Sequence, residues 1–413
     1  MLTGCQLHAH LCSLGESTRL SSGAKSTALS TKAVPVKVMY VVGARPNFMK
    51  VAPVIAAAER WNADPRSPIQ FERLLVHTGQ HYDELLSAVF FRQLGLPQPD
   101  EYLGVGSGSH AQQTARLLET LEPVMCRHEP DVVLVPGDVN STCAGALAAA
   151  KLNVPVAHLE AGLRSGDHSM PEEINRIVAD HVSDLLFTTC ADGDANLLRE
   201  GIAPDKIVNV GNTMIDSLVQ LRSSAQATVA ATRALMRVED GALVLVTLHR
   251  PSNVDDPEQL LRLLGELREV AEELPVVFPM HLRTRDRLAG LHAEGSTSHP
   301  RLHLVEPLGY IEFVGLMMAA SVVVTDSGGV QEETTYLGVP CITLRTTTER
   351  PITVACGTNK LVDPYASAGI LSAVHEAVEM GHTVPAPVLP LWDGHAGDRV
   401  IDALARWVSR REG

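Results

Sequence analysis

Aromatic side chains are scarce in this sequence of 413 residues, where Phe, Trp and Tyr together make up 4%. The hydrophobic fraction is nevertheless 45%, so Ala, Val and Leu must fill most of the interior. No apolar run approaches the ~18 residues of a membrane-spanning helix, and we expect no membrane insertion. The net charge of −14 argues against non-specific binding to nucleic acid or to anionic membranes.

Cysteine pairs and metal-binding motifs are also missing. The cysteines are odd in number and form no Cys-x-x-Cys pair, and the histidines show no His-Glu-x-x-His spacing. These absences predict buried, reduced thiols in a cytoplasmic protein, with neither a disulfide framework nor a structural or catalytic metal. The seven cysteines are Cys5, Cys12, Cys126, Cys143, Cys190, Cys341 and Cys356.

The first segment of the chain differs from everything that follows. Residues 1–35 are rich in Ser and Thr, lack periodicity and contain a single acid, Glu16. Such a segment has too little apolar surface to form a core, so we predict a disordered extension.

From Val36 onward, short apolar runs alternate with helical patterns, as in a doubly wound, mostly parallel α/β sheet. We predict one Rossmann-like domain over residues 36–212 and a second, nucleotide-binding one over residues 213–390, facing each other across a cleft. An Ala/Thr-rich stretch at 225–241 is expected to be a connection between them. A C-terminal helix within residues 391–413 is expected to pack back on the first domain.

Three carboxylates lie at the edge where open α/β sheets bind ligands. Asp138 follows an apolar strand and a Pro-Gly turn, Glu160 ends the next apolar strand, and Glu172 opens a helix after Pro171. Asp138 is also compatible with a plain loop cap, and Glu172 with an acid that favours the helix dipole. Glu160, directly after a buried strand, is harder to explain without a function.

Cations follow the first strand at the same edge. Arg45 and Lys50 stand on either side of a predicted helix start, where backbone N–H groups already favour an anion such as phosphate. The plainer alternative is a loop with solvated charges. The Gly-Ala-Arg-Pro string lacks the Gly-x-Gly-x-x-Gly dinucleotide fingerprint, which argues against an NAD enzyme.

The second half of the chain repeats these features. Gly328 and Gly329 follow an apolar strand and let backbone N–H groups approach phosphate oxygens, although a tight turn alone would also explain them. Glu333, in the helix that follows, can hold ribose hydroxyls, and Arg350 supplies a further positive charge. His249 follows another apolar strand, at a position that favours function over a purely structural role.

Nine strings occur in one order along residues 36–411: GARPNFMK, HTGQHYD, PGDVNST, HLEAGLRSGD, MPEEINR, GNTMID, TLHR, TDSGGVQEE and TTTERP. In this the chain resembles the non-hydrolysing bacterial UDP-N-acetylglucosamine 2-epimerases. The resemblance implies a glycosyltransferase-B-like fold and interconversion of UDP-GlcNAc and UDP-ManNAc without a cofactor. It implies elimination of UDP to a 2-acetamidoglucal, followed by re-addition. It also implies that the product is used in cell-surface polysaccharide biosynthesis.

The resemblance also implies roles for individual residues. The groups around the sugar would be Asp138, Glu160, Glu172 and His249. The groups that bind UDP would be Arg45, Lys50, Phe313, Ser327, Gly328, Gly329, Glu333 and Arg350. A second UDP-GlcNAc, acting as an activator, would bind at Gln80, His81 and Arg116. We expect a homodimer.

The sequence departs from the family pattern where Ala44 and Asn47 replace a Thr and a Glu, and where Leu308 replaces a Gln. Three alternative functions stay open. A hydrolysing relative would release ManNAc and UDP, a glycosyltransferase with this fold would use an acceptor, and a sensor would only bind the nucleotide sugar.

Overall fold

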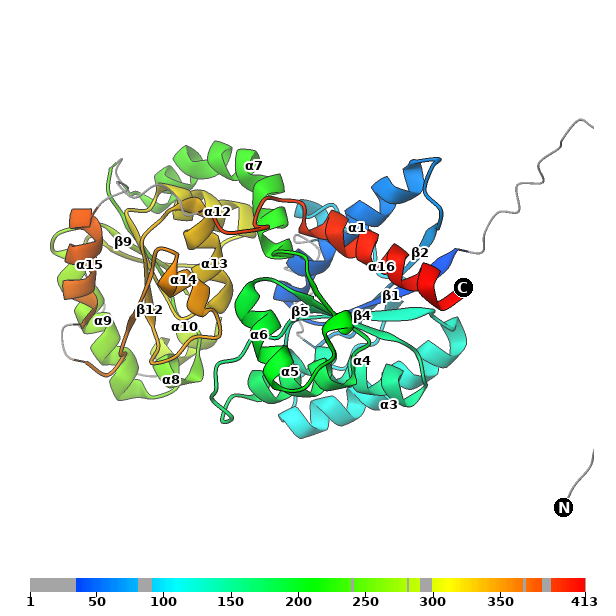
Figure 1. Ribbon diagram of the computed structural model, residues 1–413. Coiled ribbons are helices and arrows are strands. Elements are labelled where there is room, and N and C mark those ends of the chain that lie inside the picture. The colour runs from blue at the N-terminus through cyan, green and yellow to red at the C-terminus, as the bar shows by residue number, and fades with distance from the viewer. Residues whose placement is uncertain are drawn as a thin grey trace, which may run out of the picture. The chain divides into compact units, whose positions relative to one another are not determined.

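The structure is a computed structural model that describes residues 35–80, 91–238, 241–280, 282–289, 299–366, 369–380 and 388–412. The predicted extension lies outside these residues, apart from Pro35. Two parallel sheets with helices between their strands make up the described chain, as Figure 1 shows.

The first sheet is parallel throughout, with strand order β3-β2-β1-β4-β5-β6-β7. Its central strands read as continuous apolar runs because both of their faces are covered. All five residues of β4 and all six of β5 are buried. The strands are β1 (Val36–Val42), β2 (Phe71–His77), β3 (Glu101–Tyr102), β4 (Val132–Pro136), β5 (Val156–Ala161), β6 (Leu185–Thr188) and β7 (Ile207–Asn209).

Some helices of the first half begin where the sequence offers a cap or a proline. Ser109 caps α3 by accepting a hydrogen bond from the backbone N–H of Gln112, and Pro171 occupies the first turn of α5. The helices are α1 (Arg45–Ala63), α3 (His110–His128), α4 (Asn140–Lys151), α5 (Pro171–Val182) and α6 (Ala191–Arg199), with a 3₁₀ turn, η1 (Pro204–Lys206).

The connection predicted at 225–241 is wrong, because most of it is helix. Helix α7 (Thr213–Met236) starts at the Asn212 cap and ends where Arg237 adopts a left-handed conformation, with φ of 57°. Alanine has the highest helix propensity, and the Ala-rich composition of this stretch therefore extends the helix. A Cβ on Gly315 would lie 2.6 Å from the carbonyl oxygen of Ala225, so glycine there permits close packing against α7.

The second sheet is also parallel, with strand order β10-β9-β8-β11-β12-β13. Its strands are β8 (Val244–Thr247), β9 (Val276–Pro279), β10 (Leu302–Val305), β11 (Val322–Thr325), β12 (Cys341–Leu344) and β13 (Asn359–Val362). Its helices are α8 (Pro251–Val254), α9 (Pro257–Ala271), α10 (Leu282–Ala289), α12 (Tyr310–Ala319), α13 (Gly328–Leu337), α14 (Pro351–Ala355) and α15 (Gly369–Met380).

The last helix, α16 (Ala396–Glu412), packs against α1 of the first half, and the two lie side by side in Figure 1. A Cβ on Gly397 would lie 2.6 Å from the carbonyl oxygen of Pro53, so the first turn of α16 touches the α1 backbone. The Gly397 N–H donates to Oδ2 of Asp216 in α7 at 2.7 Å. The boundaries of the two domains stay a prediction.

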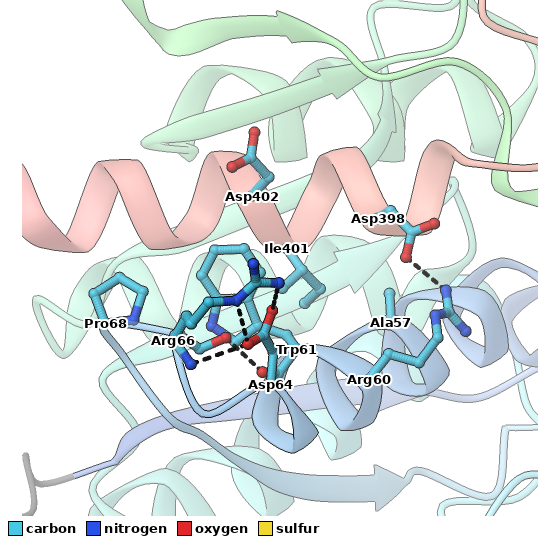
Figure 2. Close-up of a pocket in the computed structure, with 10 residues that line it drawn as sticks. Ala57, Arg60, Trp61, Asp64, Arg66, Pro68, Asp398, Ile401 and Asp402 are labelled. Atoms are coloured by element: carbon cyan, nitrogen blue, oxygen red, sulfur yellow. Dashed lines mark hydrogen bonds and ion pairs between the residues drawn. The ribbon is translucent and has the colours of Figure 1, made fainter.

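A shallow pocket of about 600 Å³ lies where the end of α1 meets α16 (Figure 2). Ion pairs between exposed side chains cross it, Arg60 with Asp398 at 2.6 Å and Arg66 with Asp64 at 2.7 Å. None of the predicted site residues lines it.

Five cysteines lie in the described part of the chain, and all five are free thiols. Cys143, Cys190 and Cys341 are buried as expected, but Cys126 and Cys356 are exposed, so the prediction of burial is wrong for these two. Within the described ranges, no group of three His, Cys, Asp or Glu side chains is placed to hold a metal ion. No helix among those described is both long and apolar enough to cross a membrane.

Candidate active site

Glu160 is the centre of the candidate site. It is 3% exposed and has a φ of 70°, a left-handed conformation that is unusual for any residue other than glycine. The register between β5 and β6 shifts between Leu159 and Ala161, so Glu160 occupies an irregularity at the strand end. Such backbone strain costs about 1–3 kcal/mol and concentrates at functional sites. The sequence pattern gave no indication of this left-handed conformation.

Two cations hold the Glu160 carboxylate. Lys50 Nζ, in the second turn of α1, lies 2.7 Å from Oε2 of Glu160, and Lys50 is itself 4% exposed. Arg350 Nη2 donates to Oε1 of Glu160 at 2.9 Å. Lys50 follows a strand of the first sheet and Arg350 follows a strand of the second. The carboxyl ends of both sheets therefore contribute to one buried cluster.

Arg350 pairs with two further carboxylates. Its Nε lies 3.0 Å from Oε2 of Glu332, and its Nη1 donates to Oε1 of Glu349 at 2.7 Å. Burial alone would lower the pKa of Arg350, but Glu332, Glu160 and Glu349 outweigh it and raise this pKa. The guanidinium is thus held firmly in its charged form.

Glu349 was not among the predicted site residues, yet it contacts three arginines. Besides Arg350, it pairs with Arg345 Nη1 at 2.7 Å and with Arg250 Nη2 at 3.5 Å. Burial would raise the pKa of Glu349, but Arg350, Arg345 and Arg250 hold it well below its usual range. The available signal was its position between Arg345 and Arg350 in a strand-end loop, where a carboxylate is needed to offset clustered cations.

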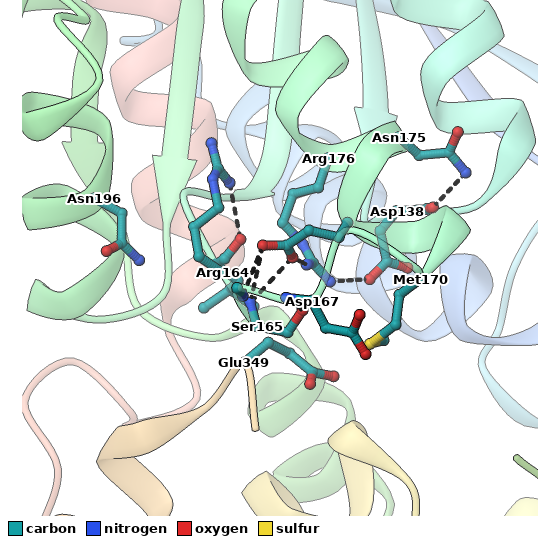
Figure 3. Close-up of polar contacts among 12 residues, drawn as sticks. Asp138, Arg164, Ser165, Asp167, Met170, Asn175, Arg176, Asn196 and Glu349 are labelled. Atoms are coloured by element: carbon teal, nitrogen blue, oxygen red, sulfur yellow. Dashed lines mark hydrogen bonds and ion pairs between the residues drawn. The ribbon is translucent and has the colours of Figure 1, made fainter. Parts of the chain in front are cut away.

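Asp138 follows β4 and faces α5, as Figure 3 shows. Its Oδ2 forms a short ion pair with Nη2 of Arg176, and its backbone carbonyl accepts a hydrogen bond from Nδ2 of Asn175 at 3.0 Å. Burial would raise the pKa of Asp138, but Arg176, Lys50 and Arg350 outweigh it and lower this pKa. Asp138 is therefore a carboxylate within the positive field of the same cluster.

The two adjacent acids of α5 differ in their surroundings. Glu173 is 1% exposed, and it accepts hydrogen bonds from the backbone of Ser165 and Gly166 while pairing with Arg176 at 2.7 Å. Glu172 is partly exposed, and its side chain forms no hydrogen bond or ion pair with another described residue. Glu173 is thus committed to holding the loop, whereas Glu172 is available to a ligand.

His249 is oriented by Asp326. Its Nδ1 lies 2.9 Å from Oδ1 of Asp326, and its backbone N–H also donates to that carboxylate. Burial would raise the pKa of Asp326, but His249, Asn253 and the Arg250 backbone lower it to about 2. A carboxylate on Nδ1 fixes the orientation of the ring. Asp326 lies within a predicted motif, but its orienting role was not foreseen.

The predicted nucleotide-binding residues gather around the start of α13. Ser327 is its N-cap, and Gly328 and Gly329 form its first turn. A Cβ on Gly328 would lie 2.4 Å from Nη1 of Arg350, so glycine is needed to accommodate this arginine. Phe313 in α12 is partly buried and packs against the core of the second sheet.

Glu333 lies one turn further along α13 and accepts a hydrogen bond from the hydroxyl of Tyr310 at 2.7 Å. Burial raises the pKa of Glu333 to about 7, although the Tyr310 hydrogen bond and the nearby Arg45 oppose this shift. The Arg45 side chain is exposed at the beginning of α1.

The predicted activator residues are placed only in part. Gln80 is buried, and its Oε1 accepts hydrogen bonds from the N–H and the hydroxyl of Ser141 at the start of α4. Arg116 is exposed on α3 and donates to the carbonyl of Ser107 at 2.8 Å. His81 lies outside the described residues. The activator site stays a prediction.

Asn47, one of the departures from the family pattern, has a clear structural role. Its Oδ1 accepts hydrogen bonds from the N–H groups of Gly43 and Ala44, and its Nδ2 donates to the carbonyl of Pro136. Asn47 therefore ties the turn that carries Arg45 to the end of β4.

Two parallel sheets whose strand ends supply one charged cluster define an α/β fold of the glycosyltransferase-B type, as predicted. A family model described as UDP-N-acetylglucosamine 2-epimerase matches residues 65–405. The chain belongs to this family.

Individual relatives agree with the family match. The chain is 43% identical over 374 residues to UDP-N-acetylglucosamine 2-epimerase of Methanocaldococcus jannaschii, covering 89% of this chain and 99% of that protein. A crystal structure from the same organism, in complex with UDP-GlcNAc and UDP, has a TM-score of 0.80 at 40% identity and covers 90% and 100% of the two chains. A UDP-2,3-diacetamido-2,3-dideoxy-D-glucuronate 2-epimerase of Pseudomonas aeruginosa is 40% identical over 377 residues, covering 90% and 100%.

Proposed function

We propose that this protein epimerises UDP-GlcNAc and UDP-ManNAc reversibly at C2 without hydrolysis, by eliminating UDP to a 2-acetamidoglucal and adding it back. The observation that carries the proposal is the buried contact of Glu160 with both Lys50 and Arg350. A carboxylate able to exchange a proton thus lies directly against two cations able to receive a departing diphosphate.

The chemistry requires this combination. No carbonyl is adjacent to C2 of the sugar, so its proton becomes removable only as the bond from C1 to the UDP oxygen breaks. Cations must then stabilise the departing diphosphate, and carboxylates must stabilise the oxocarbenium-like carbon and transfer protons. Lys50, Arg350 and Arg45 are the cations that would stabilise the departing diphosphate.

Re-addition with protonation on the opposite face needs an acid/base group on each side of the ring. The candidates are Asp138, Glu160, Glu172 and His249. Asp138 and Glu160 share the positive field of one cluster, Glu172 has no partner among the described residues, and Asp326 orients His249. Their differing surroundings suit distinct steps of proton transfer.

Incubation of UDP-GlcNAc in heavy water, followed by NMR and mass spectrometry, tests the proposal. We expect deuterium at C2 of both epimers, with UDP still attached to nearly all of the sugar. Accumulation of free UDP and ManNAc in equal amounts would identify a hydrolase instead, and an unlabelled C2 would exclude the elimination.

The Pseudomonas relative makes the sugar itself worth testing. UDP-2,3-diacetamido-2,3-dideoxy-D-glucuronate, offered in competition with UDP-GlcNAc, should be labelled more slowly if our proposal is correct. Faster labelling of the glucuronate would support the proposed reaction but identify the glucuronate as the preferred substrate.

A further inference from the structure

His158 is a buried residue of β5 whose two ring nitrogens both face oxygen atoms. Its Nδ1 lies 2.7 Å from Oδ1 of Asp180, its Nε2 lies 2.7 Å from the carbonyl oxygen of Gly137, and its side chain is fully buried. A neutral imidazole has one N–H donor and one lone pair. One of the two contacts would then set a nitrogen lone pair against an oxygen lone pair.

Neither oxygen can supply the missing proton. A carbonyl oxygen is only an acceptor, and the Asp180 carboxyl is held in its ionised form because its Oδ2 pairs with Nη1 of Arg164 at 2.7 Å and accepts from the Gly162 N–H at 3.2 Å. Turning the ring over would replace both nitrogens by carbons and lose both hydrogen bonds. The geometry therefore requires a proton on each nitrogen of His158.

Charge balance supports the same assignment. Besides Asp180, Arg164 also pairs with Glu200, its Nη2 lying 2.7 Å from Oε2 of Glu200. Nδ1 of His181 lies 3.9 Å from the same oxygen. Two carboxylates, Asp180 and Glu200, are offset by Arg164 and by a charged His158. A buried carboxylate with too few cations would be costly, so a charged His158 completes the cluster.

His158 and Asp180 together hold the two segments of the candidate site that carry Glu160 and Asp138. His158 lies two residues before the strained Glu160, and Asp180 also binds the N–H of Gly162, two residues after it. The Gly137 carbonyl that His158 holds belongs to the peptide leading directly into Asp138.

We propose that His158 is a fixed imidazolium which, together with Asp180, positions the backbone of Glu160 and Asp138 for catalysis. Because its side chain is fully buried and both ring nitrogens contact protein oxygens, it acts as a positioning residue.

The protonation is tested by NMR on the intact protein with 15N-labelled histidine. Ordinary histidines, with unperturbed pKa near ~6.5, are neutral at pH 9 and show one protonated and one unprotonated nitrogen. We expect one histidine to keep both nitrogens protonated at pH 9, and its signal to vanish in His158→Gln. If every histidine is neutral at pH 9, the proposal is wrong. The wild-type spectrum decides this even if the variant fails to fold.

The positioning role rests on the proposed function and is tested by kinetics. His158→Gln and Asp180→Asn should lower kcat by about 10²-fold, the scale for a catalytic group displaced by about 1 Å, while KM stays within about twofold. His128→Gln is the matched control, because His128 Nε2 also pairs with a carboxylate, Glu101, at 2.7 Å, but at the surface. It should keep full turnover.

Unchanged kcat in both variants would overturn the positioning role, and so would a rise in KM without a fall in kcat. The two proposals fail separately. If the wild-type protein does not label C2, the epimerase proposal fails while the NMR result still decides the charge of His158.

Discussion

Replacing Arg350 by alanine should destabilise the fold far more than replacing Lys50, although both are buried cations on the same carboxylate. Arg350 lies within 3.0 Å of three carboxylates, Glu160, Glu332 and Glu349, whereas Lys50 forms one ion pair among the described residues, with Glu160. Removing one partner from a buried ion pair costs about 3–5 kcal/mol, because the remaining charge is left without compensation. We expect a loss of that size from Arg350→Ala.

Lys50→Ala leaves Glu160 paired with Arg350, so it should remove about one charged hydrogen bond, or about 1.5–3 kcal/mol. Urea denaturation at pH 7 measures both values. Arg60→Ala is the matched control, since its ion pair with Asp398 is largely exposed and should contribute less than ~1 kcal/mol.

A double-mutant cycle sharpens the test. Glu332→Gln removes the charge of one partner, so the double variant Arg350→Ala/Glu332→Gln should be more stable than the sum of the single losses predicts. Strict additivity, or a loss in Arg350→Ala no larger than in Arg60→Ala, would refute the assigned charge compensation.

Three further outcomes are expected. Amide variants of the acids around the sugar should lower kcat by ~10² or more in steady-state kinetics: Asp138→Asn, Glu160→Gln and Glu172→Gln. Burial raises the pKa of Asp216 from 3.8 to about 6, so the free energy of unfolding should fall as pH rises from about 4 to 6. The variant Asp216→Asn still accepts the hydrogen bond from the Gly397 N–H and should abolish this loss of stability, as urea titrations at pH 4 and 7 would show. Tyr310→Phe removes the hydroxyl that holds Glu333 and should raise KM more than it lowers kcat, and an unchanged KM would contradict this role.

Most of the fold was predictable because its strands are buried on both faces. Continuous apolar runs such as 276–279 and 322–324 lie within β9 and β11, since a parallel sheet covered by helices leaves no polar face to interrupt the pattern. Strand β13 was missed because only two of its four residues, Leu361 and Val362, are apolar. Helix α7 was cut short because Ser and Thr in residues 222–232 resemble a loop, whereas alanine propensity and packing against α12 keep the helix intact.

The site was predictable as a set of residue types at strand ends, but not as a network. The positions of Glu160, Lys50 and Arg350 near strand ends identified them as candidate site residues, and the structure places them in contact. The left-handed backbone of Glu160 was not predictable, because it results from a register shift between two strands. Asp326 was missed as a site residue because its role depends on His249, far away in the chain, whereas Glu349 was overlooked although its neighbours Arg345 and Arg350 gave a local signal.

The charges of the site show why a count of cations overstates the field that a ligand meets. Arg350 and Lys50 read as free positive charges in the sequence, but Glu160, Glu332 and Glu349 largely compensate them in the fold. In the proposed function, a diphosphate that binds these cations has to share them with Glu160 or replace it as their partner.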